Sequence, residues 1–291
     1  MILNNLLPGL REIRAPLIAG YLWLIAAWFA LEPLFPDDEP SSGIVASAIA
    51  LHAAVPPLGV AVASTVVAFL IGSLSEALLA GLWRREKGYG GILFTPPIGP
   101  RGIQAMQTVA LREAEHISRT LQETGVSLSS ALHEPLQSND IPTVAGLINE
   151  SRVQVGNATG LPSTVIPERD AVMYMTVVIR TALEEERDLL ATRLIGEESE
   201  LFGSIDRLRA ESNLRFEIGP PLIALTFVLL VRSCSLVWLL TLIAVAVLWR
   251  QGSVRYRESN DLLFDALFLN RVKSPTVERI RDELELYRQR P

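Results

Sequence analysis

Glu76 is the residue whose type and position most clearly suggest chemistry. It belongs to an apolar stretch in which small or polar residues recur at every fourth position and share one helix face: Ser64, Ala68, Gly72 and Glu76. Small residues at this spacing let two membrane helices approach closely. A carboxylate in a membrane helix is by default a functional group, and in an oligomer it could line the inner mouth of a cation pathway. The alternative is a stripe that packs against another helix, with Glu76 at the membrane interface.

The other patterns that could support catalysis or metal binding are weak. The sequence has no G-x-S-x-G, Walker A, H-E-x-x-H or C-x-x-C motif. Glu113 and His116 have the spacing of half a di-iron motif, but no second E-x-x-H is present to complete such a site. Because Cys234 is the only cysteine, an internal disulfide and a multi-cysteine metal site are excluded. We therefore expect no enzymatic activity, cofactor or metal.

The apolar residues of the chain are concentrated in blocks. The chain has 291 residues, of which 49% are hydrophobic and 20% charged, and its mean hydropathy is +0.31. The apolar blocks are residues 16–31, 57–75 and 218–249. The second has a length close to the roughly 20 residues that span a bilayer. The net charge of −6 argues against a nucleic-acid binder that works through a basic surface.

These blocks predict an all-α integral membrane protein in which two N-terminal and two C-terminal membrane helices flank a helical module. The first two helices are expected near residues 15–35 and 57–83, as a membrane pair over 1–87 with a short outer loop. A cleaved signal peptide is the alternative for the first helix. The bulky Trp23 and Trp28 and the lack of a small-x-small cleavage site favour a retained anchor.

The last block, residues 218–250, is too polar at its centre for a simple single crossing. A single span would leave Arg232 near mid-bilayer, at a cost of about 3 kcal/mol. A hairpin that turns near 232–235 instead places Arg232 and Trp238 at the far interface. The hairpin arms are only 16 and 15 residues long, shorter than a bilayer requires. A re-entrant hairpin and a three-span chain with its tail outside are therefore the alternatives.

Basic residues near the segment ends indicate the orientation. Arg11 and Arg14 precede the first helix and the loop after that helix is acidic, so the positive-inside rule places the N-terminus in the cytoplasm. The same rule places the C-terminus inside. The residues expected to anchor the helices at the inner interface are Trp83, Arg84, Arg85, Trp249 and Arg250.

The polar region between the membrane pairs is expected to be a cytoplasmic helical module over residues 88–217. It contains 11 arginines and 18 acidic residues, a net charge of −7. Apolar periodicity predicts a long helix near 167–217, which Gly196 and Gly203 could break. It would form either a coiled-coil stalk that oligomerises the protein or, as we prefer, part of an intramolecular bundle. Residues 251–291 are expected to form an amphipathic helical tail that docks on the module.

Three segments carry a resemblance to a known group of proteins. Residues 206–222 (DRLRAESNLRFEIGPPL), Gln251-Gly252 and residues 258–263 (ESNDLL) resemble uncharacterised multi-spanning membrane proteins of high-GC Gram-positive bacteria. The likeness covers residues 165–280 and implies a membrane protein without implying an activity. Within it, Gly219, Pro220 and Pro221 end the charged juxtamembrane stretch, and the proline pair is expected to re-aim the chain there.

The sequence favours a non-enzymatic role for this protein. We expect a multi-pass protein of the bacterial inner membrane that anchors its acidic module to the lipid bilayer for a regulatory or scaffolding purpose. Its partners would be the bilayer and an unidentified cytoplasmic protein, and not a nucleic acid. The alternative is a homo-oligomeric, ion-permeable pore that the module gates.

Overall fold

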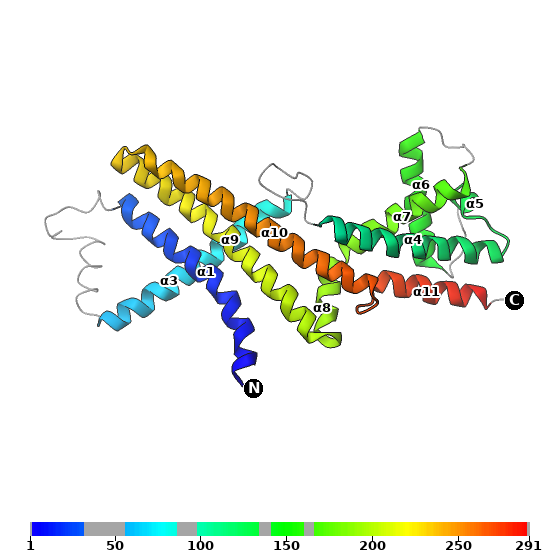
Figure 1. Cartoon of the computed structure of the whole chain (residues 1–291), viewed down its shortest axis with the longest axis horizontal. Coiled ribbons are helices and arrows are strands. Elements are labelled where there is room, and N and C mark those ends of the chain that lie inside the picture. The colour runs from blue at the N-terminus through cyan, green and yellow to red at the C-terminus, as the bar shows by residue number, and fades with distance from the viewer. Residues whose placement is uncertain (1, 32–55, 86–97, 134–140, 160–165, 290–291) are drawn as a thin grey trace. The chain divides into compact units, whose positions relative to one another are not determined.

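The structure is a computed structural model that describes residues 2–31, 56–85, 98–133, 141–159 and 166–289. All regular secondary structure in these ranges is helical, which confirms the expected all-α fold (Figure 1). The chain separates into two compact units. The first unit is Met1–Pro97 with Arg207–Arg257, and the second is Ile98–Asp206 with Glu258–Pro291.

Four of the described helices are long and apolar enough to cross a membrane. They are α1 (Ile2–Leu31), α3 (Pro57–Arg85), α9 (Ser199–Ser233) and α10 (Leu240–Phe268). Large apolar side chains remain exposed on them, such as Leu70 and Leu240 at 60% and 63%. A surface of this kind is costly in water and is typical of helices that face lipid. The chain is therefore compatible with a multi-pass membrane protein. The outer loop expected between α1 and α3 lies outside the described residues.

Helices α1 and α3 pack against each other through small residues. Gly20 of α1 and Gly72 of α3 are both buried. A Cβ atom added at Gly20 would collide with the backbone of Ala68, and one added at Gly72 would collide with the backbone of Pro16. The two backbones therefore approach as closely as glycine permits, which is how membrane helices without large interfacial side chains gain contact.

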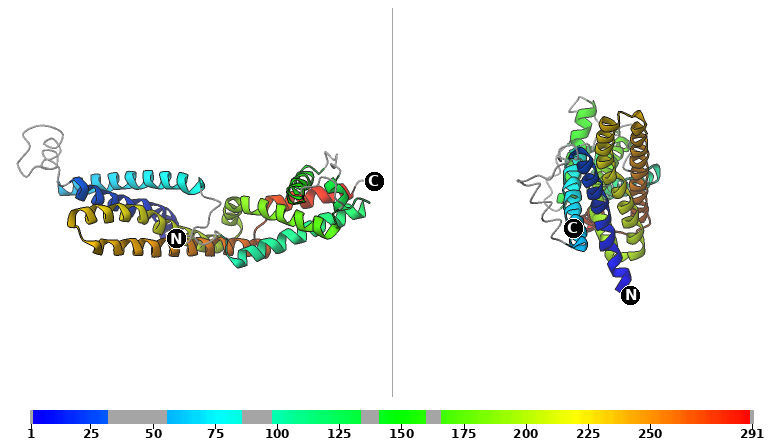
Figure 2. Two further views of the ribbon diagram at one scale, coloured as in Figure 1. Left: turned by 90° about the horizontal axis from the view of Figure 1, so that it is seen from above. Right: turned by 90° about the vertical axis from the view of Figure 1, so that its left-hand side faces the viewer.

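Helices α9 and α10 run side by side as an antiparallel hairpin (Figures 1 and 2). The Ser212 hydroxyl donates to the Gly252 carbonyl at 2.8 Å, and the Thr226 and Thr241 hydroxyls share a hydrogen bond of 2.7 Å. The chain turns at Cys234, whose φ is 47°. The apolar arms predicted from the sequence are shorter than a bilayer requires. The helices themselves extend well beyond those arms, because α9 has 35 residues and α10 has 29.

The second unit is a helical bundle with its own core. Its helices, besides the ends of α9 and α10, are α4 (Pro100–Glu123), α5 (Leu128–His133), α6 (Pro142–Thr159), α7 (Glu168–Glu185), α8 (Arg187–Glu197) and α11 (Pro275–Arg288). Met106 and Ile117 of α4 and Met175 of α7 are among its most buried side chains. Phe264 and Ile280 come from the C-terminal part of the chain and join the same core, so the tail packs on the module.

The single long helix expected near residues 167–217 is divided in the structure. It becomes α7, α8 and the first half of α9, with breaks at Glu186 and Glu198. Glu198 has φ −141° and ψ 82°, which ends α8, and its carboxylate pairs with Arg271 at 3.4 Å. Glu186 contacts the start of α11. Both breaks coincide with long-range contacts, and α9 then continues past residue 217 to Ser233.

Four carboxylates of the second unit cap the N-termini of helices that are distant in sequence. They are Asp261 at α4, Glu168 at α5, Glu283 at α6 and Glu186 at α11. At α6, Glu283 accepts hydrogen bonds from the amides of Thr143 at 3.0 Å and Val144 at 3.1 Å. The first amides of a helix have no partner within the helix and carry the positive end of its dipole. Part of the acidic excess of the module therefore has a structural role.

We expect Glu283→Ala to lower the free energy of unfolding by about 1 kcal/mol, because the first amides of α6 lose their acceptor. Hydrogen exchange at Thr143 and Val144 in the full-length protein, together with chemical denaturation, measures the effect. Glu285→Ala is the matched control, because Glu285 is exposed on the same helix. Equal losses in the two variants would contradict the capping role.

Candidate functional site

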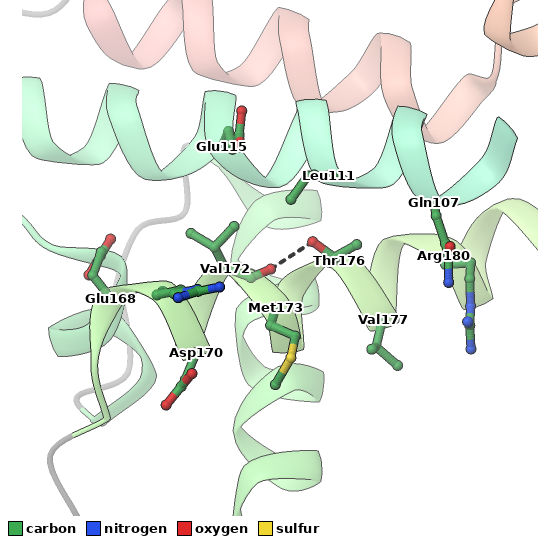
Figure 3. Close-up of a pocket in the computed structure, with 11 residues that line it drawn as sticks. Gln107, Leu111, Glu115, Glu168, Asp170, Val172, Met173, Thr176, Val177 and Arg180 are labelled. Carbon is green, nitrogen blue, oxygen red and sulfur yellow. Dashed lines mark hydrogen bonds between the residues drawn. The ribbon is translucent and has the colours of Figure 1, made fainter. Parts of the chain in front are cut away.

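A groove of about 670 Å³ lies between α4 and α7 of the second unit (Figure 3). Its apolar lining is Leu111, Val172, Met173 and Val177, and its charged lining is Glu115, Glu168, Arg169, Asp170 and Arg180. Leu111 points from α4 toward α7, where the Thr176 hydroxyl donates to the Val172 carbonyl at 2.7 Å. The groove thus combines an apolar strip with charges of both signs.

Two large apolar side chains of this groove remain exposed. Met173 is 55% and Leu111 is 44% exposed, whereas Met175 and Ile179 on the other side of α7 are fully buried. The inner faces of α4 and α7 therefore supply the core of the unit. The exposed side chains of Leu111 and Met173 remain accessible to a binding partner. A groove of this kind can receive the apolar face of an amphipathic helix.

A smaller hollow of about 300 Å³ lies between α4 and α11 and is lined by charged and titratable residues. They are Arg112, Glu113, Glu115, His116, Arg119 and Arg281. The Glu113 side chain is 2% exposed and accepts hydrogen bonds from Nε and Nη2 of Arg281, the first at 3.3 Å. The hydrogen bond to Glu113 raises the pKa of Arg281 above its ordinary value, and partial burial opposes this effect. The pair joins the two helices.

The Glu113–His116 spacing does not produce a metal site in the described part of the chain. Glu113 is held by Arg281, and His116 is exposed. No group of three or more His, Cys, Asp or Glu side chains among the described residues is arranged to hold a metal ion.

The stripe on α3 has two parts with different surroundings. Ala68 and Gly72 lie at the close approach to α1. Ser64 is half-buried and donates to the Ala61 carbonyl at 2.9 Å, and Glu76 is exposed. The small residues are thus placed for helix packing within one chain, while the carboxylate remains accessible.

The hairpin turn contacts the C-terminal end of α1. Arg232 is exposed, and its Nη1 donates to the Phe29 carbonyl at 3.2 Å while the guanidinium lies 6.0 Å from the centre of the Phe29 ring. Trp238, in the 3₁₀ helix η2 (Leu236–Leu239), donates from Nε1 to the Ser233 hydroxyl at 2.8 Å. Arg232 and Trp238 therefore lie at the same end of the first unit, where their polar groups have partners.

The residues Gly219, Pro220 and Pro221 lie inside α9, which continues through the site where the proline pair was expected to re-aim the chain. Proline has no N–H, so the carbonyls of Phe216 and Glu217 lose their helical donors. Trp249 of α10 supplies a donor for one of these two carbonyls, because its Nε1 donates to the Phe216 carbonyl at 3.4 Å. The Trp249 ring occupies the space that a Cβ atom at Gly219 would need.

Glu217 is the residue of this region that the sequence analysis missed. It is 7% exposed, and its Oε2 has no hydrogen-bond partner within the described residues. The carboxylate of Glu76, on α3, acts on it electrostatically. Its position directly before the last apolar block and the proline pair could have indicated a special role for this residue. Helical periodicity instead assigned Glu217 to the end of the module expected over residues 88–217.

The inner anchors are described only in part. Trp249 is half-buried and Arg250 is exposed. Trp83, Arg84 and Arg85 belong to the last turn of α3, and their side chains lie outside the described part of the structure.

Comparisons with protein-family models, curated proteins and solved structures found no match to this chain. The resemblance of residues 165–280 to membrane proteins of high-GC Gram-positive bacteria therefore remains a prediction. Among the described residues, the groove between α4 and α7 and the buried carboxylate of Glu217 are the arrangements that could bind a partner or an ion.

Proposed function

We propose that this chain is a non-enzymatic, multi-pass protein of the bacterial inner membrane that presents a helical module to a cytoplasmic protein. The groove between α4 and α7 carries the proposal, because two of its apolar side chains, Leu111 and Met173, are exposed although the core beneath them is filled. The membrane helices anchor the module to the bilayer, and both termini lie in the cytoplasm. The role is regulatory or scaffolding and uses no cofactor.

The chemistry of the groove indicates the class of partner. Leu111 and Met173 supply apolar contacts, and Arg180 and Asp170 lie at the charged part of the lining. An amphipathic helix with apolar residues at helical spacing and charges of both signs on its flanks matches this lining. Specificity would come from the charges, and most of the affinity from burial of the apolar strip.

A photo-crosslinking residue at position 173 of the full-length protein, in its native membrane, tests the groove. We expect one discrete adduct at 173 in several-fold excess over a control probe at 189, because Leu189 is also exposed in this unit, at 49%, but is not a groove residue. Val177→Asp should abolish the adduct while leaving the helical content unchanged, since a charge in the apolar strip must be desolvated on binding. Equal labelling from 173 and 189, or an adduct that survives Val177→Asp, would rule out the groove.

A homo-oligomeric, ion-permeable pore is the second candidate, and the exposed carboxylate of Glu76 on a helix long enough to cross a membrane favours it. The module would act on such a pore through α9, which includes residues of both units. A carboxylate that lines a cation path lowers the energy of a passing cation. We therefore expect Glu76→Gln to reduce cation flux in liposomes severalfold if the pore exists. Unchanged flux, a monomeric mass in detergent, or no membrane depolarisation on overexpression would exclude this candidate.

A further inference from the structure

Glu217 is a buried carboxylate without a partner. More than nine-tenths of the residue is shielded from solvent, and its Oε2 accepts no hydrogen bond from the described residues. An isolated ionised carboxylate is strongly disfavoured away from water, so such a group normally acquires a positive charge nearby or a proton. Something outside the described side chains must therefore satisfy this oxygen.

The cations on the same helix do not neutralise Glu217. Arg209, two turns earlier on α9, keeps Nε and Nη2 buried and likewise without hydrogen-bond partners among the described residues. Arg215 is turned toward Glu211, because its Nη1 donates to the Glu211 carbonyl at 2.8 Å and lies 3.7 Å from the carboxylate. Neither guanidinium forms an ion pair with Glu217.

Of the charged groups on the neighbouring helices, one carboxylate acts on Glu217, and Arg14 of α1 is exposed. Glu76, on α3, adds a second carboxylate that acts on Glu217. On α10, Trp249 is neutral and donates to the Phe216 carbonyl, and Arg250 is exposed. Because Pro221 cannot donate to the Glu217 carbonyl, the same turn of α9 also has a backbone oxygen without its helical donor. In membrane proteins, such freed carbonyls and buried carboxylates together bind Na⁺ or protons.

We propose that Glu217 and Glu76 form a binding site for one monovalent cation, supplied either as Na⁺ or as a proton. The buried Glu217 oxygen is the primary ligand, and the exposed Glu76 is the point of entry. The described residues hold no cluster of three or more metal-binding side chains. This site is independent of the groove between α4 and α7 and of any partner bound there.

Thermal denaturation of the full-length protein in phosphatidylcholine nanodiscs tests the site. In the Na⁺ arm, NaCl replaces choline chloride at constant ionic strength and pH 8.5. In the proton arm, the pH is lowered from 8.5 to 5.5 in choline chloride alone. We expect the wild type to be stabilised saturably in at least one arm, and the responding arm identifies the cation. Glu217→Gln should lose at least nine-tenths of that response, and Glu76→Gln should raise the half-saturating concentration about tenfold.

Glu211→Gln is the matched control, because Glu211 lies on the same helix but pairs with Arg207 and Arg215. It should retain the full response. If Glu217→Gln fails to fold, Glu217→Asp replaces it and should shift the half-saturating concentration at least tenfold, because the shorter side chain withdraws the oxygen. The proposal is overturned if the wild type responds in neither arm, if Glu217→Gln responds like Glu211→Gln, or if Glu217→Asp binds unchanged.

Discussion

Arg281→Ala is expected to lower the free energy of unfolding by about 3 kcal/mol, because it leaves the Glu113 carboxylate buried without its partner. Glu113 is 2% exposed at its side chain and takes two hydrogen bonds from the guanidinium, which itself is 47% exposed. The exposure of Arg281 and the presence of Arg112 and Arg119 in the same hollow place the loss at the lower end of the range for buried pairs. Denaturation of the full-length protein, with hydrogen exchange in α4 and α11, measures it.

Two further variants distinguish the loss of the Glu113–Arg281 ion pair from a general destabilisation of α11. Arg279→Ala removes an exposed arginine from the same helix and should change stability by less than about 0.5 kcal/mol. Replacing both Glu113 and Arg281 with leucine should recover most of the loss, since a buried ion pair can be exchanged for apolar residues at little cost. A loss for Arg281→Ala no larger than that for Arg279→Ala would contradict the role of the pair.

Gly72→Val is expected to destabilise the α1–α3 pair by about 3 kcal/mol, at the upper end of the cost of overpacking. A Cβ atom at residue 72 would collide with the carbonyl and Cα of Pro16, and this obstacle is backbone. A backbone cannot rotate aside as a side chain can, so the two helices must separate along their whole contact. Unfolding of the reconstituted protein by dodecyl sulfate, followed by hydrogen exchange in α1, measures the loss.

Ala63→Val is the matched control for this experiment. Ala63 lies on α3 but is exposed, so the added methyl groups meet no helix within the described unit. We expect a change of less than about 0.5 kcal/mol in the same assay. Equal effects at positions 63 and 72 would mean that the close approach at Gly72 does not hold α1 and α3 together.

Much of the fold follows from local features of the sequence. The apolar blocks predicted four long membrane helices, because the length and composition of a segment decide whether it can span a bilayer. The polar cluster at 232–235 predicted the turn, which lies at Cys234. The helical module expected over residues 88–217 includes α4, whose buried residues recur at helical spacing.

The ends of helices in the module could not be predicted in this way. The breaks at Glu186 and Glu198 coincide with contacts to Thr276 and Arg271. The sequence offered Gly196 and Gly203 as possible breaks and polar residues in the apolar seam at Glu186 and Glu197, but it did not indicate the contacting partners, which are 90 and 73 residues away. The continuation of α9 through Pro220 and Pro221 could not be predicted locally either. A donor from α10 replaces one of the two N–H groups that the prolines lack.

By itself, the sequence determined that this protein is helical, that it has four apolar helices fit for a membrane, and where the apolar and charged segments lie. These properties depend on spacing and composition within about 20 residues. Only the tertiary structure decided what each acidic residue does. Glu113 meets an arginine 168 residues away, Glu283 caps a helix 140 residues away, and Glu217 is buried with an oxygen that accepts no hydrogen bond from the described residues. The role of a carboxylate depends on the charge and donors that folding brings to it, and local sequence does not contain that information.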